Sequence, residues 1–578
     1  MKISQIKIHG IKSYTESSVD MSNYTVFVGE NNSGKSNILF ALLWFFGKEK
    51  LALKDVNSSI NSDDDPYIEV EFELQKDEEF THPEEYLVDG KFKVRAVISR
   101  SKISDKAMAC EYYGYTGNTE EDMKDTKLLG WKTVAKPSFG DVIYMPSVRP
   151  LSEELKFTAN SSLNQLVTKN IIARIKVEDE KNQHYGRVVE SITALSNFIS
   201  EGEDSAIQKL KEDISKKMLD YGSVRIGFDL VPPDAEDLIK SCFRPHTSIA
   251  GIGDKLPLTS QGDGFQRSMM FSLIANLAEL NKAEQKISKK SAKNECTFYL
   301  IEEPELFLHP NHQTYFRNKL EEIANSYDAQ IILTSHSPYF LNNVEKYSQI
   351  KRVYMDNVIS QIAQVSDKEI DAICIDNGRL IAAAKNECKT IKLSESEIKA
   401  ESEKIAKADH LRYLLWIDPT RANAFLSQKV ILVEGPTEKA LFSFLFNNPK
   451  GAFYDESETA KITIIDTVGK YHFYKFAKLL NKFGIKVWCI YDGDNDVCKE
   501  GPISHKLLNE NIEKLKTDAV IKDCLRIDPN IEINLGFVKG VINPDVEFYV
   551  NLEENIHECI KSVGYLKIVD FIKEIIAS

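Results

Sequence analysis

Hydrophobic and polar residues alternate along the first part of the chain in the pattern of antiparallel β-strands. A first strand is expected from Ile3 to Ile8, and later alternating runs at 67–74 and 92–98 indicate further strands. The pattern therefore predicts a strand-rich lobe over residues 1–150.

The pattern changes after this lobe. Residues 151–222 are rich in Lys, Glu, Asn and Ser, and their apolar residues recur at helical spacing, which predicts a helical insertion. Strand signals return within 223–365, where helix and strand patterns then alternate as in a parallel-sheet domain. Residues 366–424 are charged and helical, and they are expected to connect to a second α/β alternation over 425–578.

Length and hydropathy limit the class of protein. A chain of 578 residues is too long for a single core, so two or three domains are expected. No apolar run approaches the roughly 18 residues that span a membrane. The start, MKISQIKIHG, has no charged-then-apolar leader, so a cytoplasmic location and no membrane partner are expected.

Charge and cysteine content limit the chemistry. The net charge of -14 argues against a wholly basic protein that coats DNA, but it allows a local basic face and suits a protein that gathers carboxylates around divalent metals. The nine cysteines are scattered, and no two have the CxxC spacing of a zinc site. Reduced, mostly buried thiols are therefore expected.

A glycine-rich turn follows the short apolar run at 24–28. Residues Gly29 to Ser36 fit the pattern GxxxxGK[ST] and precede a helical run, which is the context that a phosphate-binding loop requires. In such a loop, backbone N–H groups hold the phosphates, Lys35 reaches the outer phosphates, and the Ser36 hydroxyl holds Mg²⁺. The candidate nucleotide-binding residues here are Asn31, Asn32, Ser33, Gly34, Lys35 and Ser36.

Paired carboxylates follow a second apolar strand, at 298–301. Glu302 would orient Mg²⁺ and its water, and Glu303 would polarise the water that attacks the nucleotide. A further strand at 331–335 leads into His336. A lone histidine is more often structural, but this one lies where a histidine would contact the γ-phosphate of ATP.

The segment 259–267 is rich in glycine and precedes an apolar helix. A glycine-rich helix start forms an anion site, for which Gly262 and Gly264 are the candidate residues. The segment resembles a divergent ABC signature, which in ABC proteins caps ATP held by the partner subunit. This resemblance implies an active form that is at least a dimer, with ATP in the interface.

Two more apolar strands end in carboxylates in the last third of the chain. The run 430–433 leads into Glu434, and the run 487–491 leads into Asp492 and Asp494. Each motif alone could equally be a helix cap or an acidic turn. Because the carboxyl ends of parallel strands meet at one edge of a sheet, however, the three side chains are expected to form an oxygen cage for Mg²⁺ or Mn²⁺.

Together these motifs resemble a known family. GENNSGKSN, SQGDGFQR, IEEPELFLHP and LTSHSP resemble the ATPase half of the OLD (overcoming lysogenisation defect) family and its RecF and SMC relatives, and the later carboxylate motifs resemble a Toprim domain. The resemblance implies an α/β protein in which an ABC-type ATPase with a helical dimerisation insertion precedes a C-terminal α/β Toprim nuclease domain. The expected divisions are an ATPase N-terminal lobe at 1–150, the insertion at 151–222, the C-terminal ATPase part at 223–365, a helical connector at 366–424 and the Toprim domain at 425–578.

The resemblance also implies further metal ligands. Toprim nucleases of the OLD family use two metals, so a second group of carboxylates is expected. Asp545 and Glu547 resemble the family's late acidic motif and are the candidates, and Glu438, one turn after Glu434, could also reach the metals.

Two basic positions are interpreted from the same resemblance. A catalytic lysine is expected near the C-terminus, with Lys561 as the better candidate and Lys567 as the alternative. The turn at Gly469 and Lys470 matches the family's middle turn and is interpreted as architectural.

The leading hypothesis is an ATP-regulated DNA endonuclease that depends on Mg²⁺ or Mn²⁺. The Toprim centre would cleave DNA, and an ATPase homodimer or tetramer would control access. The resemblance to Gabija-type and retron-associated effectors implies a role in defence against phage, with a helicase, or a reverse transcriptase and its non-coding DNA, as a partner encoded nearby.

Two alternatives stay open. The chain could be an ATP-switched DNA-binding or sensor protein of RecF type without cleavage activity, which metal-dependent cutting would distinguish. A primase or topoisomerase role is remote, because neither a catalytic-tyrosine domain nor a zinc-ribbon segment is evident. A group of lysines between residues 282 and 293 would either neutralise DNA phosphates or form a solvated loop.

Overall fold

The computed structural model divides the chain into two compact units. Unit 1 comprises Met1–Tyr144, Lys293–Glu305 and Pro310–Ser578, and unit 2 comprises Met145–Ala292 and Leu306–His309. The residues that the structure describes are 1–75, 80, 83–103, 110–125, 128, 140, 142–147, 184–200, 246–248, 255–257, 260–266, 268–269, 272, 276, 296–326, 329–341, 346–389, 392–416, 418–494, 504–537 and 544–578. The group of lysines between 282 and 293 and most of the expected insertion lie outside these residues.

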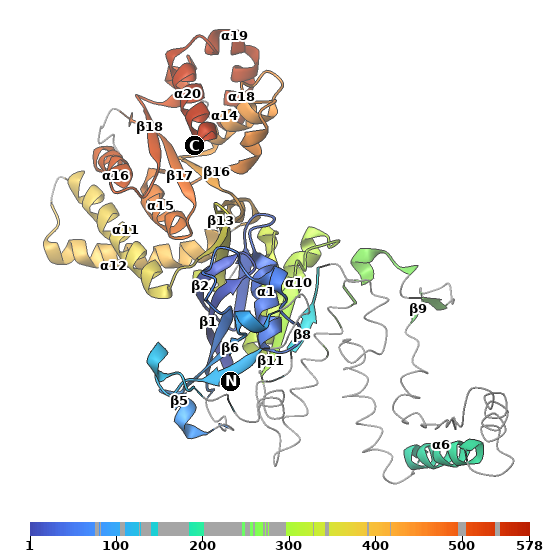
Figure 1. Ribbon diagram of the computed structural model, residues 1–578. Helices are drawn as coiled ribbons and strands as arrows, with labels where there is room; N and C mark the ends of the chain where they lie inside the picture. Colours follow the sequence, from blue (N-terminus) through green and yellow to red (C-terminus); the bar gives the residue numbers. More distant parts are fainter. Residues whose placement is uncertain are drawn as a thin grey trace. The chain divides into compact units, whose positions relative to one another are not determined.

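The N-terminal lobe is an antiparallel sheet of order β2–β1–β4–β6–β5, with β7 paired to β6 (Figure 1). Along the pairing of β1 with β4, Ile6 lies opposite Val70 and Ile8 opposite Ile68, and all four residues are buried. The predicted alternation thus gives the sheet one buried face. Its strands are β1 (Lys2–Ile11), β2 (Tyr14–Asp20), β4 (Tyr67–Glu73), β5 (Leu87–Val88), β6 (Lys91–Val97) and β7 (Glu111–Gly114).

A second sheet, of order β14–β13–β3–β12–β11–β8, carries the nucleotide motifs. Strands β13, β3, β12 and β11 run parallel, whereas β14 is antiparallel to β13. The carboxyl ends of β3, β11 and β12 therefore lie on one edge. The strands are β3 (Tyr24–Val28), β8 (Val142–Met145), β11 (Thr297–Glu302), β12 (Ala329–Ser335), β13 (Ile350–Asp356) and β14 (Ile359–Ala363).

The core of the ATPase part lies around helix α1 (Lys35–Phe45). Eight of its eleven residues are buried, as expected for a helix that is apolar on every side. Its core cluster contains Ile8 and Phe72 of the antiparallel sheet together with Phe298 and Ile332 of the parallel sheet. The helix therefore packs between the two sheets, and α10 (Pro310–Ser326) packs against β12 and β3.

A helical hairpin occupies the segment for which the sequence predicts a connector. It consists of α11 (Asp367–Glu387) and α12 (Glu395–Trp416), followed by the short α13 (Pro419–Ala422). Asp409 is fully buried between them, where it accepts hydrogen bonds from Asn377 Nδ2 at 2.6 Å and Lys475 Nζ at 2.8 Å. Because a buried carboxylate is costly without partners, this triad fixes the hairpin against helix α15 (Phe473–Lys482).

The C-terminal domain is built on a sheet of order β16–β15–β17–β18. All its pairings are parallel. Four strands therefore place their carboxyl ends along one edge, which is the edge where the sequence predicts the oxygen cage. The strands are β15 (Lys429–Val433), β16 (Ile462–Asp466), β17 (Lys486–Asp492) and β18 (Asp523–Ile527).

Helices cover both faces of this sheet (Figure 1). Trp488 and Ile490 of β17 share a core with α14, α18 and α20, whereas Tyr491 points the other way and contacts Phe473 of α15. Successive side chains of β17 thus pack into the helical layers on opposite faces of the sheet, as in other parallel sheets that are covered on both faces. The helices are α14 (Pro436–Asn447), α15 (Phe473–Lys482), α16 (His505–Thr517), α17 (Ile531–Asn534), α18 (Pro544–Glu554), α19 (Ile556–Cys559) and α20 (Val563–Ala577).

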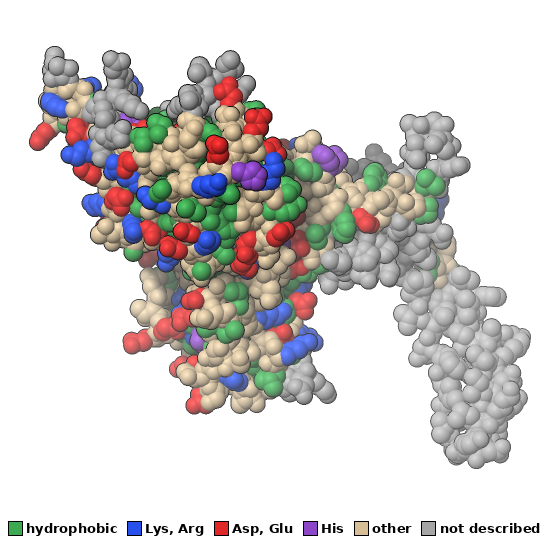
Figure 2. Space-filling view, turned by 90° about the horizontal axis from the view of Figure 1, so that it is seen from above, with side chains coloured by type: hydrophobic (Ala, Val, Ile, Leu, Met, Phe, Trp, Pro, Cys, Tyr) green, Lys and Arg blue, Asp and Glu red, His purple; other side chains and the backbone are tan. Residues whose placement is uncertain are grey.

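Unit 2 is described in part. Helix α6 (His184–Ser200) falls within the expected helical insertion, and β9 (His246–Ser248) pairs antiparallel with β10 (Lys255–Pro257). Among the described residues, no helix is both long enough and apolar enough to cross a membrane. On the face shown in Figure 2, acidic and basic side chains are interspersed, so the net charge of -14 does not form one acidic field there.

Candidate functional site

The phosphate-binding loop joins β3 to α1. Gly29 has φ 151°, and a Cβ there would lie 1.9 Å from the carbonyl oxygen of Val353, so this position requires glycine. Lys35 begins α1, and its buried ammonium group donates to the carbonyl oxygens of Gly29 at 3.1 Å and Glu30 at 2.6 Å. Its Nζ also lies 3.4 Å from Ser33 Oγ. The lysine therefore folds back onto the loop that would hold the phosphates.

The other predicted residues of this loop differ in exposure. Asn31, Asn32 and Ser36 are exposed, whereas Ser33 is buried. Burial lowers the pKa of Lys35 to about 8, although the charges of Glu303, Glu305 and Glu30 act in the opposite direction. Among the described residues, this ammonium group forms no ion pair, and a triphosphate would supply an anionic partner.

The predicted paired carboxylates lie at the carboxyl end of β11. Glu302 ends the strand, and Glu303 comes next with a positive φ of 41° and its N–H bonded to Thr334 O at 2.9 Å. The Oε1 atom of Glu303 lies 3.2 Å from Nε2 of His336. Burial and the nearby Lys35 charge lower the pKa of His336, so the neutral imidazole is favoured. The fold therefore brings the predicted water-activating glutamate and the predicted histidine into contact.

Glu305 is a residue of this site that the sequence reasoning did not assign. Its carboxylate accepts from the backbone N–H of His336 at 2.5 Å and from Ser335 Oγ at 3.0 Å. Burial raises its pKa, and these hydrogen bonds oppose that rise. Glu305 therefore fixes the turn that presents His336, and its place in the run IEEPE was the available signal.

The signature candidates lie in unit 2. The carbonyl oxygen of Gly262 accepts from the N–H groups of Phe265 at 2.9 Å and Gln266 at 3.1 Å, which starts a helical turn. A Cβ on Gly264 would lie 2.7 Å from the carbonyl oxygen of Phe307. Glycine at this position thus allows close packing of two backbone segments.

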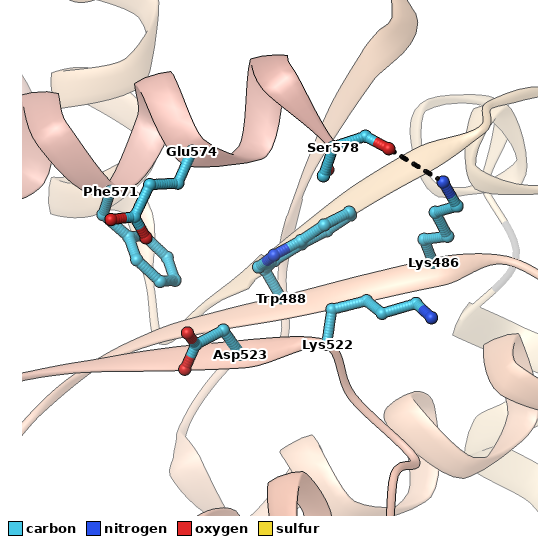
Figure 3. Close-up of a pocket in the computed structure, with 7 residues that line it drawn as sticks. All are labelled: Lys486, Trp488, Lys522, Asp523, Phe571, Glu574 and Ser578. Carbon is cyan, nitrogen blue, oxygen red and sulfur yellow. Dashed lines mark hydrogen bonds between the residues drawn. The ribbon is translucent and has the colours of Figure 1, made fainter.

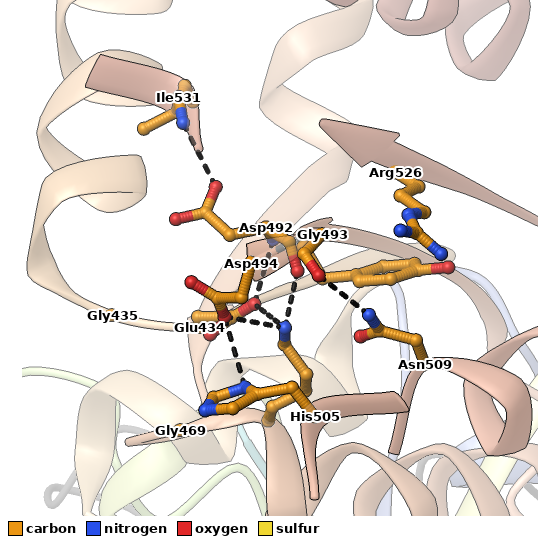
Figure 4. Close-up of polar contacts among 12 residues, drawn as sticks. Glu434, Gly435, Gly469, Asp492, Gly493, Asp494, His505, Asn509, Arg526 and Ile531 are labelled. Carbon is orange, nitrogen blue, oxygen red and sulfur yellow. Dashed lines mark hydrogen bonds and ion pairs between the residues drawn. The ribbon is translucent and has the colours of Figure 1, made fainter. Parts of the chain in front are cut away.

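The C-terminal domain brings Glu434, Asp492 and Asp494 together at the carboxyl ends of β15 and β17 (Figure 4). The Oε1 atom of Glu434 accepts from the backbone N–H of Asp492 at 2.8 Å. The Oδ1 atom of Asp492 accepts from the backbone N–H of Ile531 at 3.0 Å. Glu434, Asp492 and Asp494 are therefore neighbours, as the predicted oxygen cage requires.

Buried carboxylates crowd this edge. Burial, and then the charges of Glu438, Glu434, Glu532 and Asp494, raise the pKa of Asp492 to about 9. Burial and the charge of Glu434 raise the pKa of Glu438 to about 8. Because like charges at short range oppose ionisation, these shifts reflect a local shortage of positive charge.

Asp494 is in a different electrostatic state. Its Oδ2 atom lies 2.9 Å from Lys470 Nζ and 3.1 Å from His505 Nδ1. Although burial acts in the opposite direction, the close contacts with His505 and Lys470 lower the pKa of Asp494. The negative charge of Asp494 is therefore already balanced by side chains of the protein.

The sequence motifs do not indicate His505 or Glu532, and Lys470 is interpreted from them only as part of an architectural turn. Each lies just after a strand end or at a helix start, but β18, which precedes Glu532, is only partly buried and has a weak apolar pattern. His505 begins α16, which is remote from any motif. Their sequence signal was position alone, and it becomes informative only once the order of the sheet is known.

Other predicted residues lie elsewhere in the domain. Asp545 is half-buried and Glu547 is exposed, both on α18, whereas Lys561 precedes α20 and Lys567 lies on it, both exposed. None of the four is among the residues joined by the contacts described above, so their assigned roles stay predictions.

The donor set fits a divalent cation of the Mg²⁺ or Mn²⁺ type, because it consists of carboxylate oxygens. No group of three His, Cys, Asp or Glu side chains among the described residues is already arranged to hold a metal ion. Glu434 and Asp492 each turn one carboxylate oxygen toward a backbone N–H.

A pocket of about 320 Å³ lies at the opposite end of the same sheet (Figure 3). Lys486, which begins β17, lines it together with Trp488 and Glu574. Because Asp492 ends β17, this pocket is not part of the carboxylate edge.

These features define a class of protein: a phosphate-loop ATPase joined to a parallel α/β domain of Toprim type. The chain belongs to the AAA ATPase domain family, whose model matches residues 1–129 and 111–341. Residues 425–494 match the TOPRIM domain of overcoming lysogenization defect protein-like proteins. The resemblance and the fold class predicted from the motifs are thereby confirmed, and the two domains together support an enzyme with ATPase and nuclease parts.

Similar proteins cover most of the chain. The Old nuclease of Escherichia phage P2 is 24% identical over 90% of this chain and 80% of its own length. The OLD nuclease of Thermus scotoductus is 21% identical over 92% of each chain. The endonuclease GajA of Bacillus cereus strain VD045 is 23% identical over 86% of this chain and 75% of its own.

Proposed function

We propose that this protein is an ATP-regulated DNA endonuclease that depends on a divalent metal. The observation that carries the proposal is the group of buried carboxylates at the carboxyl ends of β15, β17 and β18, in a domain of Toprim type. Their mutual repulsion favours a bound cation, and the relatives named as nucleases support DNA cleavage as the reaction.

Different side chains of this site would have different roles. Glu434, Glu438, Asp492 and Glu532 would hold the cation, which would supply Lewis-acid activation of a phosphodiester. Lys470 and His505 keep Asp494 ionised and fixed.

The ATPase part would work through the contacts already described. Lys35 and Ser36 would bind the phosphates and Mg²⁺, Glu302 would orient the ion, and Glu303 would polarise water under the control of His336. We further propose that Gly262 and Gly264 cap ATP in a partner subunit, so that the active form is a homodimer or a larger homo-oligomer.

Contacts between the two parts of unit 1 support regulation by ATP. Arg352 of β13 is buried, and its guanidinium group donates to the carbonyl oxygens of Ser427 at 2.9 Å and Phe483 at 3.1 Å in the Toprim domain. Gln428 Nε2 donates to Oε2 of Glu30, inside the phosphate loop, at 2.6 Å. A change in this loop on nucleotide binding therefore has a short route to the start of β15.

The test is cleavage of supercoiled plasmid by the full chain with Mg²⁺ or Mn²⁺, each with and without ATP. We expect nicking or linearisation that requires the metal and whose rate changes with ATP. ATP turnover without any metal-dependent cutting would contradict the proposal and would favour an ATP-switched DNA-binding protein. A role in defence against phage is part of the proposal, and a plaque assay with cells that express the wild type or the Asp492→Asn variant would test it.

A further inference from the structure

A turn centred on Gly493 joins the two aspartates that follow one another at the end of β17. The N–H of Gly493 donates to the carbonyl oxygen of Ile527 at 2.7 Å, and the N–H of Asp494 donates to that of Pro529 at 2.8 Å. A Cβ on Gly493 would lie 1.5 Å from a side-chain oxygen of Asp528, so this position requires glycine. The turn therefore packs closely against the segment that follows β18.

A buried asparagine holds the other side of this turn. Asp494 has φ 53°, in the left-handed region that residues other than glycine adopt rarely, and such a conformation persists only when surrounding contacts fix it. The carbonyl oxygen of Gly493 accepts a hydrogen bond from Asn509 Nδ2 at 2.9 Å (Figure 4). Because Asn509 is only 1% exposed, this bond is shielded from water. Asn509 is thus one of the contacts that fix the backbone next to Asp494.

Asn509 belongs to a row of polar side chains along α16. His505, Asn509 and Glu513 are spaced four residues apart, so they lie on one face of the helix. His505 Nδ1 lies 3.1 Å from Asp494 Oδ2, and Tyr491 Oη donates to Glu513 Oε1 at 2.7 Å. Successive turns of α16 therefore contact the end of β17 and its turn in order along the chain.

The start of α16 is fixed independently of this turn. Ser504, the N-cap residue, is buried, and its N–H donates to the carbonyl oxygen of Ala384 in α11 at 3.0 Å. The neighbouring buried residues of the helix are Leu508, Ile512 and Leu515. Asparagine favours helices less than leucine does, so neither helix formation nor apolar packing accounts for a buried asparagine among them.

We propose that Asn509 is a positioning residue for DNA cleavage, which holds the turn between Asp492 and Asp494 so that both carboxylates stay at the carboxylate edge. His505 does the same for the side chain of Asp494. Without Asn509, the carbonyl oxygen of Gly493 would lose this buried donor, and a shift of the turn would relieve the loss. This inference rests on the proposed function, because it presumes that the two aspartates hold a metal.

The test compares Mn²⁺ affinity and plasmid cleavage in variants of the full chain, with free Mn²⁺ followed by electron paramagnetic resonance without nucleotide. Asn509→Leu keeps the size of the side chain and removes the donor. We expect it to weaken Mn²⁺ binding and to lower the kcat of cleavage, each by about 10- to 100-fold, as for other groups that support metal ligands. The KM for plasmid should change by less than about threefold, because the substitution is buried. Asp492→Asn should abolish the Mn²⁺ binding, which locates it at this edge.

Asn377 offers a matched control, because it is an equally buried asparagine in a helix and donates a hydrogen bond to Asp409. Asn377→Leu should lower the melting temperature to a similar degree, since it also removes one buried donor. Its Mn²⁺ affinity and its kcat should stay within about twofold of wild type. If Asn509→Leu does not fold, as judged by its melting curve, Asn509→Ala removes the same donor with a smaller side chain.

Two substitutions of His505 separate positioning from proton transfer. Asparagine can place an N–H donor where Nδ1 lies, but it does not exchange a proton near neutral pH. We expect His505→Asn to cut within about threefold of wild type, whereas His505→Leu should lose about tenfold or more. Equal losses in the two variants would overturn the positioning role given to His505.

The failure of this inference is distinguishable from failure of the proposed function. Equal Mn²⁺ affinity and kcat in Asn509→Leu and Asn377→Leu would overturn the role given to Asn509 and leave the nuclease proposal intact. A wild-type protein that neither binds Mn²⁺ at this edge nor cuts plasmid would overturn the proposed function itself.

Discussion

Two parallel-sheet edges in this molecule each place a buried lysine among carboxylates, yet the two lysines are in opposite situations. Lys35 donates to main-chain carbonyls of its own loop, and among the described residues it forms no ion pair, so burial lowers its pKa to about 8. Lys470 is ion-paired with Asp494 and Glu434. The edge that contains Lys35 therefore favours an added anion, which matches nucleotide binding. The edge that contains Lys470 favours an added cation, which matches metal binding.

The largest effect is expected at the cation-binding edge. Asp492→Asn should lower plasmid cleavage by about 10³-fold, because metal-ion activation contributes several kcal/mol to such reactions. ATP turnover by the same variant should stay within about threefold of wild type, an order-of-magnitude bound for a site that does not touch the nucleotide. Asp523→Asn, which changes an aspartate at the amino end of β18, is the control and should cut normally. Equal cutting by both variants would refute the site assignment.

At the anion-binding edge, Glu303→Gln should block ATP hydrolysis while binding is retained. The amide keeps the contact with His336 but cannot polarise water as a carboxylate does, and loss of such a group costs about 10²-fold or more. Turnover measured by phosphate release, together with binding of a fluorescent ATP analogue, separates the two effects. Normal turnover would overturn the role of Glu303.

A smaller effect is expected from Lys35→Ala. Loss of charge-assisted hydrogen bonds to phosphate, worth about 1.5–3 kcal/mol, should weaken ATP binding by about 10- to 100-fold. Lys50→Ala, a substitution of an exposed lysine past the end of α1, is the control. Unchanged affinity in Lys35→Ala would show that the first edge is not the nucleotide site.

The pH dependence of protein stability should report on the carboxylates at the cation-binding edge. The pKa values of Asp492 and Glu438 are raised to about 9 and about 8, above the value of about 4 in an unfolded chain. The folded chain without metal keeps protons that the unfolded chain loses, so these groups reduce stability as pH rises from about 4 to about 9. Added Mg²⁺ should therefore raise the melting temperature more at pH 9 than at pH 6. An equal shift of the melting temperature at both pH values would contradict the raised pKa values of Asp492 and Glu438.

The smallest effect concerns the link between the edges. Gln428→Ala removes one exposed hydrogen bond to Glu30, so the response of cleavage to ATP should change by about two- to tenfold, in line with about 0.5–1.5 kcal/mol for such a bond. Gln5→Ala removes a similar exposed bond to Asp20 on the antiparallel sheet and should leave the response unchanged. Identical ATP responses in the two variants would exclude Gln428 from regulation.

Much of this organisation can be predicted from the sequence, because most of the site residues follow strongly apolar strands. The runs before Gly29, Glu302, Glu434 and Asp492 are buried strands in the structure. Parallel pairing then places their ends together, which the alternation of helix and strand already indicates.

The remaining site residues depend on tertiary contacts. Lys470 and His505 reach Asp494 from two different elements. The turn that contains Lys470 indicates an architectural role and not this contact, and His505 belongs to no motif. Glu532 follows a strand with little apolar character and carries no motif, whereas Asp545 and Glu547 on α18 are predicted from the resemblance to the family's late acidic motif, and their role stays a prediction. A local pattern reports which element a residue occupies but not which distant side chain it meets.

The most direct test of the account is anomalous X-ray scattering from crystals of the full chain grown with Mn²⁺. We expect a peak about 2.0–2.3 Å from carboxylate oxygens of Asp492 and Glu438, within reach of Glu532, in keeping with metal–oxygen distances in such sites. A structure that binds Mn²⁺ only at the phosphate loop, with none at the carboxyl ends of β15 and β17, would contradict it.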